Sequence, residues 1–272
     1  MRKNYVYAFL AIIIVFTIVG YYSINKPVQT SFENEEQLTA TDVYWSYEGA
    51  NGPAEWVNVD SSYEACGRGE LQSPINIEVA KTAKQKLNEE IHLNYEEAIF
   101  SIENNGHTIQ ANSTSVDNSL LIEDEKYDLT AIHFHSPSEH QLNGQYFDME
   151  AHLFHESENG DLAVIGLFIK SGEENKLLAE MWEEMPADGN EAAKILQNPI
   201  NLQQLLPEEK SVFQYVGSLT TPPCTEGVNW FILEQPIEMS NEQINQFSSI
   251  FLQNNRPIQK LNDRDVYRIE LN

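Results

Sequence analysis

Short apolar or alternating segments dominate the middle of the chain. Residues 98–102 read Ala-Ile-Phe-Ser-Ile and residues 131–135 read Ala-Ile-His-Phe-His, while residues 162–169 are almost entirely apolar. Segments of this length and pattern are typical of β-strands. Turn-forming sequences separate them, at Asn104-Asn-Gly106 and at Asn143-Gly144. The pattern therefore predicts a core rich in β-structure.

Helical periodicity is confined mainly to two stretches. They are predicted to run from Glu173 to Glu184 and from Asn241 to Leu252. Ser240 immediately precedes the second stretch and is suited to cap it, because a serine hydroxyl accepts a hydrogen bond from a free backbone N–H of the first turn. No repeat and no long internal Gly/Ser/Pro tract divides the chain, so we expect a single folded domain.

The N-terminal segment, residues 1–25, has the composition of an export signal. Arg2 and Lys3 precede an apolar run from Tyr5 to Tyr22. The run is about long enough to span a bilayer, and no clear small-residue cleavage site follows it. It is therefore either a cleaved signal peptide or an uncleaved membrane anchor, with a buried N-terminal helix as the alternative. Both main interpretations place the rest of the chain in the periplasm or outside the cell.

Residues 26–41 are polar and acidic without clear periodicity, and we interpret them as a linker. The folded domain is predicted to occupy residues 42–272. The whole chain has 42 acidic and 16 basic residues, a formal charge of −26. This excess argues against binding to nucleic acid or to an anionic membrane surface. Its simplest interpretation is a solvated surface that keeps the protein soluble.

The two cysteines, Cys66 and Cys224, fit no metal-binding CxxC pattern. Export would place them where a disulfide persists, so we predict that they pair. Closing a loop of this length stabilises a fold by roughly 3–5 kcal/mol in the chain-entropy model. The alternative is two buried free thiols.

Two strand-like segments carry side chains that bind metals. His133 and His135 are two residues apart, as are Glu150 and His152, so each pair points to one face of its strand. If the strands are neighbours, three imidazoles and one carboxylate converge. Three histidines leave the fourth tetrahedral position of zinc open for water, which is the arrangement of a catalytic rather than a structural site. Glu150 could accept the second N–H of the His152 ring and fix its tautomer. One H-x-H pair alone is more often ordinary, and no H-E-x-x-H sequence supports a metalloprotease.

Five motifs lie along the domain, namely Tyr44-Trp-Ser-Tyr47, Gln72-Ser-Pro-Ile-Asn-Ile77, Ser136-Pro-Ser-Glu-His140, Gly217-Ser-Leu-Thr-Thr-Pro-Pro223 and Asn255-Arg-Pro257. They resemble motifs of the α-class carbonic anhydrases. The resemblance implies a β-dominated α+β fold, in which a large twisted, mostly antiparallel sheet carries short peripheral helices and a conical cavity leads to the metal. It implies the reversible hydration of CO2 to bicarbonate and a proton, by attack of zinc-bound hydroxide on CO2 in an apolar pocket.

The same resemblance implies a role for individual residues. His133, His135 and His152 correspond to the zinc ligands, and Glu150 to the partner of His152. Thr220 resembles the residue that donates to Glu139 and orients the attacking oxygen. His107 corresponds to the proton shuttle, since an imidazole titrates near neutral pH. Tyr47, Asn105 and Gln110 correspond to the residues that organise the connecting waters. Phe154, Val164, Leu219, Thr221, Val228 and Trp230 correspond to the substrate pocket, and Cys66 and Cys224 to the paired cysteines of secreted relatives.

Two positions depart from the family pattern. Relatives commonly have a glutamine at the position of Ala131, whose amide orients the first zinc histidine, and a smaller aliphatic residue at the position of Phe154. A narrower pocket should disfavour bulky esters more than CO2. The rival hypotheses are a non-catalytic binding module on the same fold and an exported zinc-binding or storage protein. The sequence leaves open whether the chain is a monomer or a homodimer.

Overall fold

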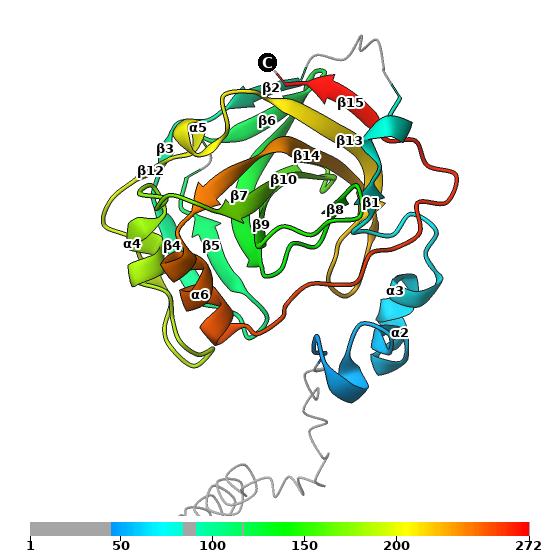
Figure 1. The fold of residues 1–272 in the computed structure, drawn as a ribbon, viewed down its shortest axis with the longest axis horizontal. Helices are drawn as coiled ribbons and strands as arrows, with labels where there is room; N and C mark the ends of the chain where they lie inside the picture. The colour runs from blue at the N-terminus through cyan, green and yellow to red at the C-terminus, as the bar shows by residue number, and fades with distance from the viewer. Residues whose placement is uncertain (1–44, 84–90, 116, 272) are drawn as a thin grey trace, which may run out of the picture. The chain divides into compact units, whose positions relative to one another are not determined.

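Eleven strands join in one mixed sheet that runs through the centre of the fold (Figure 1). The computed structural model describes residues 45–83, 91–115 and 117–271. The sheet has the order β11-β4-β5-β7-β9-β10-β14-β13-β15, and β2 and β6 are attached through the pairing of β6 with β7. Its strands are β2 (Ile91–Asn94), β4 (Phe100–Asn104), β5 (Ile109–Ser113), β6 (Ser119–Ile122), β7 (Glu125–His135), β9 (Met149–Ser157), β10 (Leu162–Ser171), β11 (Lys194–Ile195), β13 (Ser211–Ser218), β14 (Glu226–Met239) and β15 (Tyr267–Glu270).

Only one neighbouring pair in this sheet, β10 with β14, is parallel. The predicted fold class, a β-dominated single domain with a mostly antiparallel sheet and short peripheral helices, is thus confirmed. Two further sheets have two strands each, β1 (Asn76–Ile77) with β8 (Gln141–Leu142) and β3 (Glu97–Ala98) with β12 (Ile200–Asn201). The predicted export segment and linker lie outside the described residues. Within the described residues, no helix is long and apolar enough to cross a membrane.

Alternation along the central strands divides the apolar core between the two faces of the sheet. On β10, Ile165 and Leu167 belong to the larger apolar cluster, whereas Val164 and Phe168 belong to a second cluster on the other face. Successive side chains of a strand point to opposite faces, so one continuous apolar segment serves both clusters. The second face carries the candidate site.

The described helices are short and lie at the periphery (Figure 1). Helix α6 begins where predicted, and its capping box is complete, because Ser240 accepts from the Gln243 backbone N–H and Gln243 accepts from the Ser240 backbone N–H. The α-helices are α2 (Trp56–Val59), α3 (Glu64–Arg68), α4 (Ala179–Glu183), α5 (Leu202–Leu205) and α6 (Asn241–Ile250), and the 3-10 turns are η1 (Gly49–Asn51), η2 (Ser61–Tyr63) and η3 (Val79–Lys81).

The helix predicted from Glu173 to Glu184 is wrong over its first half, since only Ala179–Glu183 is α-helical. Side chains from elsewhere satisfy the backbone N–H groups that a longer helix would use. The N–H of Glu173 donates to the Glu238 carboxylate, and that of Asn175 donates to the Gln243 side chain. Tertiary hydrogen bonds therefore override the helical pattern of the sequence in this segment.

Cys66 and Cys224 form a disulfide, as predicted. Cys224 follows β13 in the loop that also carries Thr220, and Cys66 lies in α3. The bond packs against Trp56 in a small apolar cluster of its own. The disulfide therefore ties the N-terminal helices of the described chain to the loop after β13.

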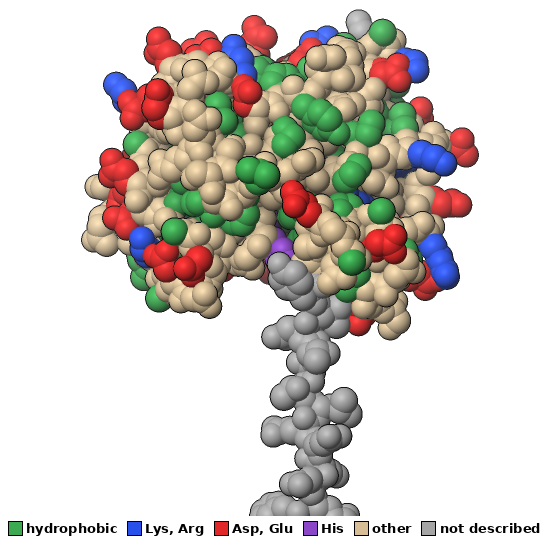
Figure 2. All heavy atoms as spheres, turned by 60° about the horizontal axis from the view of Figure 1, so that its bottom comes forward, with side chains coloured by type: hydrophobic (Ala, Val, Ile, Leu, Met, Phe, Trp, Pro, Cys, Tyr) green, Lys and Arg blue, Asp and Glu red, His purple; other side chains and the backbone are tan. Residues whose placement is uncertain are grey.

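Acidic side chains are spread over the face of the molecule seen in Figure 2, with fewer basic ones among them. This distribution agrees with the acidic composition of the chain. No single charged side dominates the view, which fits a solvated surface rather than a dedicated charged interface.

Candidate active site

The two histidine-bearing segments are neighbouring strands of the central sheet. In the antiparallel pairing of β7 with β9, His133 lies opposite His152 and His135 lies opposite Glu150. Because residues two apart share a face, all four side chains project from the same side of the sheet. This is the arrangement on which the sequence prediction depended.

Two of the histidines are held by hydrogen bonds that leave one ring nitrogen of each unused. His135 Nδ1 lies 2.7 Å from the backbone oxygen of Asn254, and His152 Nε2 lies 2.8 Å from Glu150 Oε1. The remaining nitrogens face Glu139 Oε2, at 3.6 Å from His135 Nε2 and 3.8 Å from His152 Nδ1. His135, Glu139 and His152 thus form a buried group whose ligand atoms lie within 4.8 Å of one another.

This donor set fits a divalent transition metal. Among the described residues, His152 Nδ1 and Glu139 Oε2 are buried without a hydrogen-bond partner, although buried polar atoms are normally paired. A bound cation would satisfy the unpaired nitrogen of His152. Neutral imidazole nitrogens are common ligands of zinc, and the hydrogen bond at the opposite nitrogen fixes the tautomer that binds it.

His133 stands beside this group and is not one of its members. Burial, reinforced by the nearby His135 and His152, lowers the pKa of His133 to about 3. Burial also lowers the pKa of His135, although Glu139 opposes the effect. Both rings are therefore neutral at pH 7, as metal binding requires. The ring of His133 lies 4.5 Å from that of Phe154, centroid to centroid.

Glu150 is the most heavily bonded carboxylate of the site. Its Oε2 accepts from the backbone N–H groups of Glu139 and His140, and its Oε1 lies 2.7 Å from His140 Nδ1 and 2.8 Å from His152 Nε2. Burial alone would raise the pKa of Glu150, but the adjacent His140 and His152 outweigh it and hold that pKa well below its usual range. Gly166 makes room here, since a Cβ at that position would lie 3.1 Å from Glu150 Oε1 and 2.4 Å from Ile232.

Thr220 is buried in the loop after β13, but it makes no hydrogen bond to Glu139 in the described part of the chain. Instead, Glu139 Oε1 accepts from the Arg256 backbone N–H at 2.7 Å, and Oε2 faces the histidines. The described residues therefore show both Glu139 oxygens directed at groups other than the Thr220 hydroxyl.

His107 lies in the turn between β4 and β5 and is half-buried. Its ring stacks on Trp45, with centroids 3.7 Å apart and planes 9° apart. Burial lowers the pKa of His107 below 6.5. Asn105 shapes the turn, because its side-chain oxygen accepts from the backbone N–H groups of His107 and Thr108.

Two of the three residues predicted to organise water are joined by a hydrogen bond. Asn105 donates to the Gln110 side-chain oxygen at 3.1 Å. The hydroxyl of Tyr47 is separate from this pair and has no partner among the described residues. Burial and the charge of Glu139 raise the pKa of Tyr47 well above 10, so this hydroxyl stays protonated.

The predicted pocket residues belong mostly to the apolar cluster on the site's face of the sheet. Val164, Val228 and Trp230 are buried members, while Phe154 and Leu219 are partly buried and pack against them. Thr221 is half-buried in the loop after β13. The Trp230 indole is held by its N–H, which donates to the Ser218 backbone oxygen at 3.0 Å.

Three residues of the site were missed by the sequence analysis. The backbone oxygen of Asn254 is hydrogen-bonded to the His135 ring, and the backbone N–H of Arg256 donates to Glu139. The ring of Trp45 stacks on that of His107. Any residue has a backbone oxygen, and any except proline has a backbone N–H, so the first two contacts have no signature in the sequence. The Trp45 stacking had a signal, since this aromatic residue lies within a motif that resembles the family.

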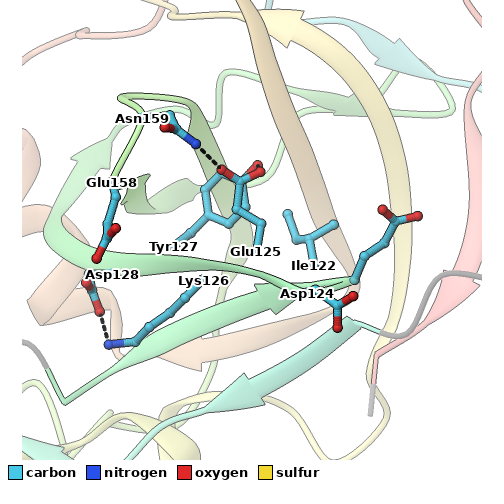
Figure 3. Close-up of a pocket in the computed structure, with 9 residues that line it drawn as sticks. Ile122, Asp124, Glu125, Lys126, Tyr127, Asp128, Glu158 and Asn159 are labelled. Carbon is cyan, nitrogen blue, oxygen red and sulfur yellow. Dashed lines mark hydrogen bonds and ion pairs between the residues drawn. The ribbon is translucent and has the colours of Figure 1, made fainter.

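A surface cavity of about 720 Å³ lies away from the histidines, around the hairpin of β6 and β7 (Figure 3). Some of the residues that line it contact each other. Lys126 Nζ lies 2.6 Å from Asp128, and Glu125 accepts from Tyr127 and Asn159. None of the predicted site residues lines it, so we assign it no ligand.

Comparisons with known proteins identify the family of the chain. A family model described as eukaryotic-type carbonic anhydrase matches residues 51–270. A carbonic anhydrase of Pectobacterium atrosepticum is 41% identical over 249 residues, which are 91% of this chain and 98% of the relative. The structure of the α-carbonic anhydrase of Thermovibrio ammonificans with the inhibitor sulfanilamide has a TM-score of 0.79 and 38% identity, covering 82% of this chain and 98% of that one. A structure of dioscorin complexed with ascorbate has a TM-score of 0.77 and 30% identity, covering 84% of this chain and 99% of that one.

The fold and the buried histidines define a class of enzymes with a metal-binding site on a large, mostly antiparallel sheet. Within this class, the chain belongs to the eukaryotic-type, or α, carbonic anhydrase family. The reaction of this family is the hydration of CO2.

Proposed function

We propose that this chain, exported from the cytoplasm, catalyses the reversible hydration of CO2 to bicarbonate and a proton with zinc held by His133, His135 and His152. The carrying observation is the pair His135 and His152, whose opposite nitrogens are fixed by hydrogen bonds while the unused ones face the same buried space. When bound, zinc would act as a Lewis acid that makes hydroxide available near neutral pH, chemistry for which carbonic anhydrases are themselves the standard example.

The residues around this centre have complementary tasks in the proposal. The hydrogen bonds of Glu150 to His152 and of Asn254 to His135 orient both rings in the absence of the metal. Val164, Val228 and Trp230 form an apolar wall that excludes water and accommodates CO2. Thr220 would turn its hydroxyl proton towards the Glu139 carboxylate, leaving an oxygen lone pair to orient the attacking group.

A hydration assay tests the proposal. The purified protein, loaded with one equivalent of zinc, is expected to hydrate CO2 in stopped-flow measurements, and removal of zinc with a chelator should abolish the activity. Sulfanilamide should inhibit it, because a sulfonamide is known to bind the Thermovibrio ammonificans relative. A protein that binds zinc tightly but leaves CO2 unchanged would contradict the proposal and favour a zinc-binding protein on the same fold.

Replacement of His107 by alanine should slow turnover by roughly a hundredfold when buffer is dilute, because each cycle must export a proton. Saturating imidazole in solution should restore much of the rate. The measurement is the CO2 hydration rate against buffer concentration. His92→Ala serves as the control, since His92 lies in β2, outside the site. Equal rates for His107→Ala and the unmodified protein in dilute buffer would remove the shuttle role.

A further inference from the structure

We propose that Phe154 is the positioning residue for the His133 imidazole. The inference rests on the proposed zinc site and adds to it the means by which its third histidine is oriented. In this protein an aromatic ring takes the place that hydrogen bonds occupy at the other two histidines.

The three histidines are not held in the same way. His135 is bonded to the Asn254 backbone oxygen and His152 to the Glu150 carboxylate. His133 makes no hydrogen bond through its ring to any of the described residues. Ala131, two positions earlier on the same face of β7, has no polar atom in its side chain to offer. A ring without such an anchor must be ordered by packing.

Phe154 is placed to supply that packing. It lies directly opposite Ala131 in the pairing of β7 with β9, and the small alanine leaves space that the large ring can enter. The Phe154 ring lies 4.5 Å from the His133 ring at an interplanar angle of 46°, and 6.2 Å from the His152 ring. Ring pairs at such separations attract each other.

Phe154 is itself held in place. It is partly buried against the apolar cluster that contains Val164, its neighbour on β10. A ring anchored on a central strand restricts rotation of the imidazole that it contacts. Metal ligands bind best when packing has already locked their rotamers, so this contact should raise zinc affinity.

A matched pair of variants separates this role from simple packing. Phe147 is also partly buried in the same cluster, and its ring stacks on Phe168 rather than on a histidine. We expect Phe154→Leu to weaken zinc binding by roughly tenfold, the lower end for residues that orient a metal ligand. Phe147→Leu should leave zinc affinity unchanged. The dissociation constant is measured by competition with a chelator.

Cobalt provides a second readout. Its visible absorption bands report ligand geometry, so the Co²⁺-substituted Phe154→Leu protein should have a shifted spectrum while Phe147→Leu matches the unmodified protein. Loss of packing alone would lower thermal stability in both variants without changing the metal spectrum. An unchanged zinc affinity and cobalt spectrum in Phe154→Leu would overturn the proposal.

A compensating substitution tests the mechanism. Because Ala131 and Phe154 share one space, Ala131→Gln alone should overpack against the ring. Combined with Phe154→Leu, the glutamine can enter the vacated space, and its amide oxygen can accept from His133. The double variant should bind zinc more tightly than Phe154→Leu alone, which makes the effects of the two substitutions non-additive. Failure of this recovery would count against orientation of His133 as the cause.

The same measurements distinguish the two proposals. If the unmodified protein binds zinc and hydrates CO2 while Phe154→Leu behaves identically, only the role of Phe154 fails. If the unmodified protein binds no zinc, the proposed zinc site fails, and the Phe154 inference fails with it.

Discussion

Replacement of His152 by alanine is expected to remove zinc and CO2 hydration together. Zinc sites in small proteins bind with roughly 10–16 kcal/mol, so one ligand contributes about 3 kcal/mol, which is more than about a hundredfold in affinity. His152 is also joined to the rest of the site by its 2.8 Å contact with Glu150. At micromolar protein the variant should lose most of its zinc on dialysis.

The activity loss should exceed the affinity loss, because residual zinc on two histidines would lack the geometry that the open coordination position needs. We expect a fall in kcat/KM of at least about a thousandfold. Metal content by mass spectrometry and stopped-flow hydration are measured on the same sample. His92→Ala is the control and should retain one zinc per chain. Full activity in His152→Ala would rule out the proposed centre.

The parts of the fold that follow from local pattern were predictable. The strands at residues 131–135 and 162–169 were recognisable from their apolar positions, and α6 from its serine cap, while the segment 98–102 proved to span the end of β3 and the start of β4. The helix predicted from residue 173 failed because the competing hydrogen bonds come from Glu238 and Gln243, which are distant in the sequence. Such partners have no local signature.

The candidate site was predictable to the extent that side-chain chemistry and two-residue spacing determine it. The sharing of a face by His133 and His135 follows from strand geometry alone. The pairing of their strand with that of His152 is a matter of tertiary register, and only the resemblance implied it in advance. Contacts made by backbone atoms, such as that of Asn254 with His135, were not predictable.

Ala131 and Phe154 are a second example of a relation that the sequence alone does not reveal. In the sequence these residues are 23 positions apart and appeared as two separate departures from the family. The register makes them direct neighbours across β7 and β9. The small Ala131 side chain therefore leaves the space that the large Phe154 ring occupies, and the two departures are one packing arrangement.

Replacement of Glu150 by alanine is expected to cause the largest loss of stability among single substitutions in the site. Glu150 is fully buried, and it joins four polar groups, namely the Glu139 and His140 backbone N–H groups and the rings of His140 and His152. Alanine would leave these groups buried without their acceptor. Each unsatisfied buried donor costs about 1–3 kcal/mol, and relaxation reduces the sum. We expect the free energy of unfolding to fall by about 3–5 kcal/mol.

Glu150→Gln separates charge from shape, because glutamine keeps the volume but replaces one acceptor oxygen with an NH2 group. That group would face either the two backbone N–H donors or the two histidine rings, so one pair of contacts must break. In urea unfolding of the metal-free proteins, the free energy of unfolding of Glu150→Gln should lie between those of the unmodified protein and Glu150→Ala. Zinc affinity should fall by roughly tenfold or more, since the His152 tautomer is no longer fixed by a carboxylate. Glu156→Gln, at an exposed position of the same strand, should change stability by less than about 0.5 kcal/mol. A Glu150→Gln protein as stable as this control would show that the carboxylate charge does not hold the two histidines.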